Sequence, residues 1–174
     1  MAASICWSIP LAKITVREIT LFGVLGAMTF AAKYVMAFLP NIEPVSLMVM
    51  LFAVTFGKKA LYPIFLYVAM EILFYGLGTW NVMYLYIWPC LGILAYGLRE
   101  MKSPLGWAVL SGAFGLLFGA LCIPVDIVIG GPGYGLSKWI SGIPFDIAHC
   151  IGNFVMALIL FSPMRTLMEK LNQG

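Results

Sequence analysis

The sequence predicts an all-α integral membrane protein with six transmembrane helices, both termini in the cytoplasm and a single domain over residues 1–174. Hydrophobic residues make up 63% of the chain and charged residues only 10%, whereas a soluble domain averages about 25% charged residues. Apolar runs recur along the whole length, and about 20 apolar residues cross a hydrocarbon core roughly 30 Å thick. No polar stretch between these runs is long enough to form a soluble domain with a core of its own.

The first predicted span covers residues 18–39. Thr15 stands three residues ahead of Glu18, which is the spacing of a helix capping box, and Pro40 ends the apolar run. Residues 1–14 mix apolar residues with a proline and a lysine. They lack the charged and apolar regions of a secretory signal peptide and are compatible with a short helix on the membrane surface.

Small residues form a ridge along this first span. Gly23, Ala27 and Ala31 recur every four residues, so they lie on one face of a helix and allow another helix to pack closely. Lys33 lies further along the same span, inside the apolar region, where a charged group is costly unless it has a partner or faces water.

Three apolar runs follow, at residues 45–57, 60–76 and 82–98. The first is short for a full span and ends at a pair of lysines, the second carries Glu71 near its end, and the third is rich in aromatic residues. A loop containing two glycines, residues 77–81, separates the last two runs.

The last two predicted spans cover residues 104–123 and 141–161. Glycines within the fifth span permit close helix packing; they are Gly106, Gly112, Gly115 and Gly119. Residues 124–135, which contain Gly-Gly-Pro-Gly-Tyr-Gly, are predicted to form a flexible loop. This stretch follows no strand and lacks the P-loop pattern. A basic amphipathic tail follows Ser162-Pro163.

The distribution of basic residues agrees with this count of spans. Six spans place one set of lysines and arginines on the side of the termini and only Lys138 on the other side. By the positive-inside rule that first side is the cytoplasm. The set comprises Lys13, Arg17, Lys58, Lys59, Arg99, Lys102, Arg165 and Lys170.

The sixth span carries polar residues at helical spacing. Asp146, His149 and Asn153 are separated by three and four positions, which places them along one stripe of a helix. Ionisable groups within a span usually face the protein interior or a water-filled cavity. We therefore expect this stripe to face the other helices. Two alternatives stay open: a helix-capping role for Asp146, and a hydrogen-bonded interior position without a ligand for His149.

Asp146, His149 and most of the other polar and aromatic residues that are costly to bury in lipid are predicted to lie in one layer, toward the outer side of the membrane. This concentration favours a cavity open to the outside. An internal Lys33–Glu71 ion pair and an interfacial aromatic belt are the alternatives. The candidate binding residues are Lys33, Tyr34, Asn41, Glu43, Glu71, Tyr75, Trp80, Asn81, Tyr84, Trp88, Asp146, His149 and Asn153.

Several functional classes lack support in the sequence. The four cysteines are far apart and the chain has a single histidine, so metal, redox and two-histidine haem sites are not indicated. The H-E-x-x-H and G-x-S-x-G motifs of hydrolases are absent, as is a Walker motif. We expect no metal, no covalently bound cofactor, no nucleic-acid partner and no ATPase activity of the chain's own.

The chain resembles the substrate-binding S-components of energy-coupling factor transporters, which import vitamins and metals in prokaryotes. The resemblance covers nearly the whole length. It rests on the size, the six spans, the A-x-x-x-A ridge Ala27-Met28-Thr29-Phe30-Ala31, and the segment Phe38-Leu39-Pro40-Asn41-Ile42-Glu43-Pro44 that follows it.

This resemblance implies a multi-pass protein of a prokaryotic cell membrane that binds its ligand near the outer surface. Asn41 and Glu43 would lie on the gating loop. The ridge of Gly23, Ala27 and Ala31 would dock onto a transmembrane coupling protein, which is attached to two cytoplasmic ATPases.

The N-terminus lacks the histidine-containing segment of the metal-specific branch, so a vitamin is favoured, with cobalamin or a corrinoid precursor first and riboflavin or pantothenate as alternatives. A different class, a small membrane enzyme acting on lipid with Asp146 and His149 as acid and base, remains open. So does a scaffold that binds no ligand.

Overall fold

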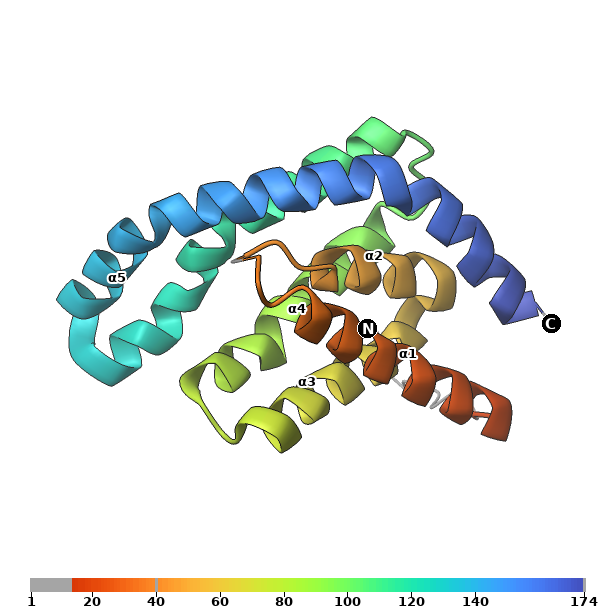
Figure 1. Cartoon of the computed structure of the whole chain (residues 1–174), viewed down its shortest axis with the longest axis horizontal. Coiled ribbons are helices and arrows are strands. Elements are labelled where there is room, and N and C mark those ends of the chain that lie inside the picture. The colour runs from red at the N-terminus through yellow and green to blue at the C-terminus, as the bar shows by residue number, and fades with distance from the viewer. Residues whose placement is uncertain (1–13, 40, 174) are drawn as a thin grey trace, which may run out of the picture.

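The computed structural model describes residues 14–39 and 41–173, and all regular structure in this part of the chain is helical. Figure 1 shows a bundle in which the long helix α5 folds back on itself beside the other helices. The elements, in chain order, are α1 (Val16–Val35), α2 (Val45–Phe56), the short 3₁₀-helix η1 (Gly57–Ala60), α3 (Leu61–Tyr75), α4 (Thr79–Gly97) and α5 (Pro104–Gln173).

Helix α1 begins at the predicted capping box. The Thr15 hydroxyl accepts a hydrogen bond from the Glu18 backbone N–H at 3.2 Å, and the Glu18 carboxylate accepts one from the Thr15 N–H at 2.9 Å. The helix ends at Val35, four residues before the predicted end of this span at position 39. Residues 36–39 form a turn instead. Most of the predicted surface helix at residues 1–14 lies outside the described residues.

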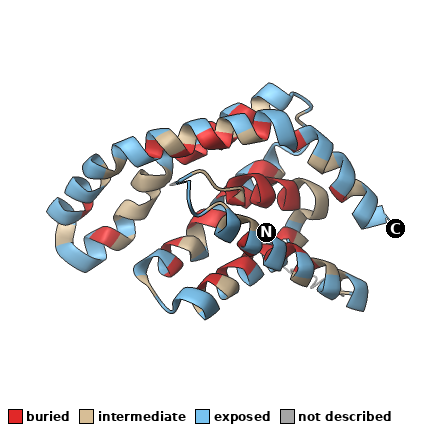
Figure 2. Cartoon of the chain, in the orientation of Figure 1, coloured by how far each residue is buried: buried red, intermediate tan, exposed pale blue. Residues whose placement is uncertain are grey.

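Helix α2 is the centre of the bundle. All residues from Val45 to Ala53 are buried, and Figure 2 shows this concentration of buried residues in the middle of the molecule. An apolar composition on every face is what a helix surrounded by other helices requires. Gly57, at a positive φ of 58°, then turns the chain through η1 into α3.

The predicted loop at residues 124–135 is wrong, because helix α5 runs from Pro104 to Gln173 with a single non-helical residue, Gly131 (φ 84°, ψ 173°). Gly131 alone supplies the backbone reversal, and Pro132 is suited to the first turn of the arm that follows. In a membrane, helical structure also satisfies backbone groups that a long loop would leave unpaired. The predicted fifth and sixth spans therefore form the two arms of α5, which lie side by side in Figure 1.

The predicted loop at residues 77–81 is shorter than expected, since α4 begins at Thr79 rather than at residue 82. The Asn81 side chain accepts a hydrogen bond from the Gly78 backbone N–H at 2.7 Å. This bond satisfies one of the free donors at the start of the helix and brings the start forward.

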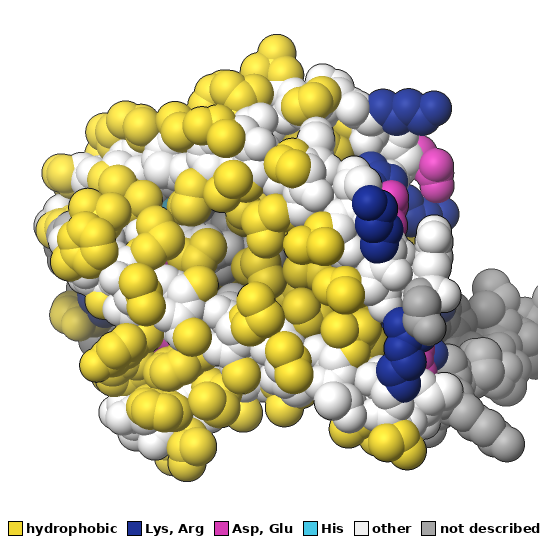
Figure 3. Space-filling view, turned by 45° about the vertical axis from the view of Figure 1, so that its right-hand side comes forward, with side chains coloured by type: hydrophobic (Ala, Val, Ile, Leu, Met, Phe, Trp, Pro, Cys, Tyr) yellow, Lys and Arg dark blue, Asp and Glu magenta, His cyan; other side chains and the backbone are white. Residues whose placement is uncertain are grey.

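Basic residues from separate elements gather at one end of the molecule, which we call the basic end. Figure 3 shows them along one edge of a surface that is otherwise mainly hydrophobic. The described members are Arg17, Lys58, Lys59, Arg99, Lys102, Arg165 and Lys170. The loop 36–44, the α3–α4 turn and the bend at Gly131 lie toward the opposite end in Figure 1. We call this the opposite end.

The structure supports a membrane location in general terms. Three stretches of the described chain are long and apolar enough to cross a membrane: Val16–Val35, Val45–Tyr75 and Pro104–Gln173. Many large apolar side chains are exposed, including Val16, Leu73, Val128 and Ile159. Contiguous exposed apolar surface of this kind is unusual in soluble monomers and is expected of lipid-facing helices.

Candidate functional site

Lys33 stands at the centre of a polar cluster built from separate parts of the chain. Its ammonium group donates a hydrogen bond to Glu71 on α3 at 2.9 Å and one to the Tyr84 hydroxyl on α4 at 3.3 Å. The Glu43 carboxylate, from the loop before α2, lies 3.9 Å away. We call these four residues the Lys33 cluster. The structure thus shows the ion pair between α1 and α3 that the sequence left open.

The loop of residues 36–44 brings Glu43 over the end of α1. Asn41 adopts a positive φ of 57°, a conformation that asparagine tolerates better than most residues. Burial raises the pKa of the Glu43 carboxyl above its ordinary value, nearby Lys33 lowers it, and Glu71 raises it further. The Glu43 carboxylate therefore lies in a place where negative charge is only partly compensated.

A cavity adjoins the Lys33 cluster at the opposite end of the molecule, and we call it the Lys33 cavity. Its volume is about 190 Å³. It is lined by the end of α1, the following loop and the end of α3, through residues Lys33, Met36, Ala37, Leu39, Asn41, Glu43 and Tyr75. Four of the sequence-predicted binding residues, Lys33, Asn41, Glu43 and Tyr75, therefore share one cavity.

An aromatic cluster continues from Tyr84 into the bundle. Trp88 is fully buried, and its ring centroid lies 5.4 Å from that of Tyr84 and 5.5 Å from that of Phe118. Phe118 in turn meets the His149 ring edge to face at 5.0 Å. Aromatic packing thus connects the Lys33 cluster with the polar stripe of α5.

The predicted stripe of Asp146, His149 and Asn153 is buried between the two arms of α5 and α2. The Asp146 carboxylate accepts a hydrogen bond from the Gly119 backbone N–H at 3.0 Å, and the Asn153 amide donates to the Ser46 hydroxyl at 2.9 Å. His149 is 3% exposed, and no described residue pairs with its Nε2 atom. The stripe faces the protein interior, as its spacing predicted.

Glycines on the first arm of α5 allow this close approach. A Cβ atom on Gly115 would lie 2.8 Å from the His149 carbonyl, and one on Gly119 would lie 2.4 Å from the Asp146 carboxylate. Such distances exclude a larger residue unless the arms move apart. Gly112 packs similarly against Phe154, whereas Gly106 meets only the Met101 side chain.

The remaining candidates lie apart from the Lys33 cavity. Tyr34 is 62% exposed and Trp80 is 43% exposed, while Asn81 caps helix α4. Asp126, within residues 124–135 that were predicted to form a loop, lies on α5 and forms an ion pair with Lys138 at 2.8 Å. These contacts account for Asn81 and Asp126 structurally and do not bring them into the cavity.

The predicted docking ridge lies on the outer surface of α1. Ala27 and Ala31 are exposed, and a Cβ atom on Gly23 would meet nothing within 4 Å. Gly26, one position away from Ala27, is instead the residue that packs against α3, beside Leu66 and the Pro63 carbonyl. The small residues therefore leave a smooth surface that the described chain does not cover.

Sequence reasoning missed Tyr67 and Phe118. Tyr67 is fully buried and stacks on Tyr84 at a centroid distance of 6.3 Å. It lies four residues before Glu71, so helical spacing alone would have placed both side chains on one face of α3. No comparable signal pointed to Phe118.

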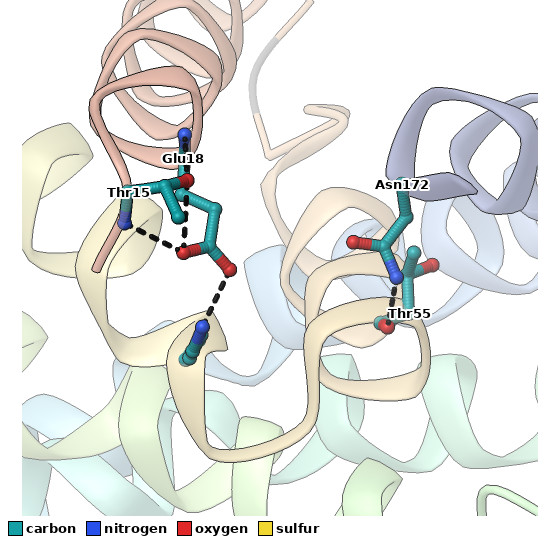
Figure 4. Close-up of polar contacts among 5 residues, drawn as sticks. Thr15, Glu18, Thr55 and Asn172 are labelled. Atoms are coloured by element: carbon teal, nitrogen blue, oxygen red, sulfur yellow. Dashed lines mark hydrogen bonds and ion pairs between the residues drawn. The ribbon is translucent and has the colours of Figure 1, made fainter. Parts of the chain in front are cut away.

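A second cavity, of about 280 Å³, lies at the basic end between the start of α1 and the end of α5. Figure 4 shows the bonds near it: the Glu18 carboxylate contacts Thr15 and the Lys59 ammonium group, and Asn172 reaches the Thr55 carbonyl. The Lys59–Glu18 contact is 2.5 Å long. These contacts connect four elements at this end.

Metal chemistry finds no support in the described residues, where no three histidine, cysteine, aspartate or glutamate side chains form a possible metal site. Cys90, Cys122 and Cys150 are free thiols, and Cys6 lies outside the described residues. The comparisons with family models, curated proteins and solved structures found no match to this chain.

Proposed function

We propose that this chain is the ligand-binding membrane subunit of an ATP-driven importer of the energy-coupling factor type, with six spans and cytoplasmic termini. The observation that carries the proposal is the Lys33 cavity. It combines a partly buried charged cluster, the loop 36–44, which contributes Asn41 and Glu43 together with the apolar Met36, Ala37 and Leu39, and one aromatic residue, Tyr75. Pockets for small organic molecules have this composition, with mainly apolar walls and a few convergent polar groups.

The six-span topology has support from the shape of α5. Its two arms pack against each other over Gly112, Gly115 and Gly119, so this helix counts as two crossings. The concentration of basic residues at one end, where the start of α1 and the end of α5 also lie, favours that end as the cytoplasmic one.

The partners in this proposal are a transmembrane coupling protein and two ATPases. The exposed ridge of Gly23, Ala27 and Ala31 supports docking, since small residues allow two helix backbones to approach closely. The chain would bind ligand by itself and transport it only with these partners. It is proposed to have no enzymatic activity.

The proposed ligand is a water-soluble vitamin. Cobalamin or a corrinoid precursor is the first candidate from the sequence, but the Lys33 cavity of about 190 Å³ is below the 300–1,000 Å³ or so typical of drug-sized ligands. A corrinoid is much larger than such ligands and requires displacement of the loop 36–44. The cavity as it stands favours a smaller vitamin.

Native mass spectrometry of the protein purified gently from its own host tests this proposal. A stoichiometric ligand of vitamin size is expected, and an absorbance spectrum recorded on the same sample would reveal a corrinoid by its colour. An empty protein that also fails to bind a panel of vitamins in titration would contradict the proposal and favour a scaffold.

An enzyme acting on lipid would give a different result. It would convert its substrate without partners, and Asp146→Asn would abolish turnover. A binding subunit shows no turnover, and the same substitution changes at most its affinity for ligand.

A further inference from the structure

The charges around the Lys33 cavity do not balance. Glu43 and Glu71 carry two negative charges against the one positive charge of Lys33. Glu71 is only 1% exposed, so bulk water screens little of this charge. A charged group within a membrane span is expensive unless an opposite charge compensates it.

Lys33 has little capacity to bind an anion. Its ammonium group already donates to Glu71 and to the Tyr84 hydroxyl. It also lies 5.1 Å from the centroid of the Tyr84 ring and 5.9 Å from that of Tyr67. An anionic ligand could use only the third donor of this ammonium group, and there it would lie beside the Glu43 and Glu71 carboxylates, whose negative charges oppose it.

Glu43, in contrast, is available. It lines the Lys33 cavity, its side chain is 18% exposed, and its carboxylate lies 3.9 Å from Lys33, beyond hydrogen-bond distance. No described residue donates a hydrogen bond to it. Burial is the main cause of the raised pKa of the Glu43 carboxyl, and Lys33 lowers this pKa without fully offsetting the burial.

A second acceptor lies deeper in the same cluster. The Oε1 atom of Glu71 is buried and forms no hydrogen bond of good geometry with the described residues; the Tyr67 hydroxyl, which is likewise unpaired, is its neighbouring donor. Most buried polar atoms in native proteins are paired, so such atoms call for a partner. The aromatic ring of Tyr75, which lines the cavity, supplies a surface on which a cation is favoured.

We propose that the Lys33 cavity binds a small organic cation, whose positively charged nitrogen pairs with Glu43 and whose apolar part lies against Tyr75. This inference rests on the proposed function, because it names the chemical class of ligand for the same site. It favours ammonium, amidinium and aromatic cations over carboxylates and phosphates.

Three matched probes test the inference: benzylammonium, benzyl alcohol and benzoate, which share a ring and differ in charge. The full chain is placed in nanodiscs of phosphatidylcholine, whose headgroups carry no net charge, and each probe is titrated by calorimetry at neutral pH. Benzylammonium should bind at millimolar concentration, about tenfold or more tighter than benzoate, since a hydrogen bond to a charged group contributes about 1.5–3 kcal/mol.

Variants assign the preference to Glu43. Glu43→Gln keeps the shape and removes the charge, so the preference for the cation should fall about tenfold, while Glu43→Asp should retain most of it. Glu100→Gln is the matched control, because the Glu100 side chain is 90% exposed at the basic end. If Glu43→Gln does not fold, the relative affinities of the wild type for benzylammonium and benzoate are sufficient to test the inference.

Benzoate binding as tightly as benzylammonium would overturn the inference, and so would the absence of binding by all three probes. Failure here is distinguishable from failure of the proposed function. A neutral or anionic ligand retained from the host would overturn the cation inference and leave the binding function intact. An empty protein that binds no vitamin would contradict the function itself.

Discussion

Replacing Lys33 with methionine removes the positive charge from the Lys33 cluster and keeps a side chain of similar length. Glu71, at 1% exposure, is then left buried without its partner at 2.9 Å. Breaking a buried ion pair in this way costs 3–5 kcal/mol or so. The Lys33 side chain retains 20% exposure, so we expect a loss near the lower end, about 3 kcal/mol.

The assay is reversible unfolding in mixed micelles, followed by tryptophan fluorescence, for the wild type, Lys33→Met, Glu71→Met and the double variant. The double variant should recover most of the lost free energy of unfolding, because it leaves no unpaired charge behind. Lys59→Met is the control. Its ion pair with Glu18 is more exposed, at 28% and 24% for the two side chains, so its effect should be much smaller.

Two results would refute this reasoning. A loss below about 1 kcal/mol for Lys33→Met would mean that Glu71 reaches water or another partner once the lysine is gone. A double variant no more stable than either single variant would mean that the two side chains stabilise the bundle independently of each other.

Three further outcomes are expected. Gly115→Ala should lower the free energy of unfolding by about 1–3 kcal/mol, because the added Cβ would lie 2.8 Å from the His149 backbone. Gly142→Ala is the control: nothing lies within 4 Å of its added Cβ, so the substitution should be neutral or stabilising in the same assay. Burial raises the pKa of Glu43 from its ordinary value of 4.5, so its ionisation costs stability. The free energy of unfolding of the wild type should therefore fall relative to that of Glu43→Gln as the pH rises above 4.5. Parallel curves of unfolding free energy against pH for the two proteins would contradict this. Ala27→Leu should leave unfolding unchanged but weaken co-purification with a coupling protein, and unaltered co-purification would exclude this surface from the proposed docking.

Spacing within a helix was the most informative part of the sequence. It placed Asp146, His149 and Asn153 on one buried stripe, because a helix brings positions three and four apart onto one face. The cost of charge in lipid likewise predicted that Lys33 and Glu71 would need partners. A Lys33–Glu71 ion pair was one of the alternatives, and the sequence could not decide between them because the answer depends on how α1 and α3 pack.

Loop boundaries were the least accurate of the predictions from sequence. Glycine and proline at positions 124–135 indicate a break in a soluble protein, yet only Gly131 leaves the helical conformation. The central place of α2 could have been inferred, because an apolar run without a polar face is suited to burial on all sides. The Lys33 cavity could not have been inferred from the sequence, because it forms from α1, α3 and a loop whose path no local sequence pattern determines.

The length of α2 has a consequence for the membrane around the protein. Its 12 residues rise about 18 Å, so even an upright α2 falls well short of a hydrocarbon core roughly 30 Å thick. This hydrophobic mismatch places part of its flanking non-helical backbone at hydrocarbon depth. Such backbone is tolerated only where protein covers it or water reaches it. The loop that carries Glu43 is partly covered by protein, and water that reaches the rest of it would form a vestibule below the headgroups, through which solutes would enter the membrane plane before they meet the protein's charged residues.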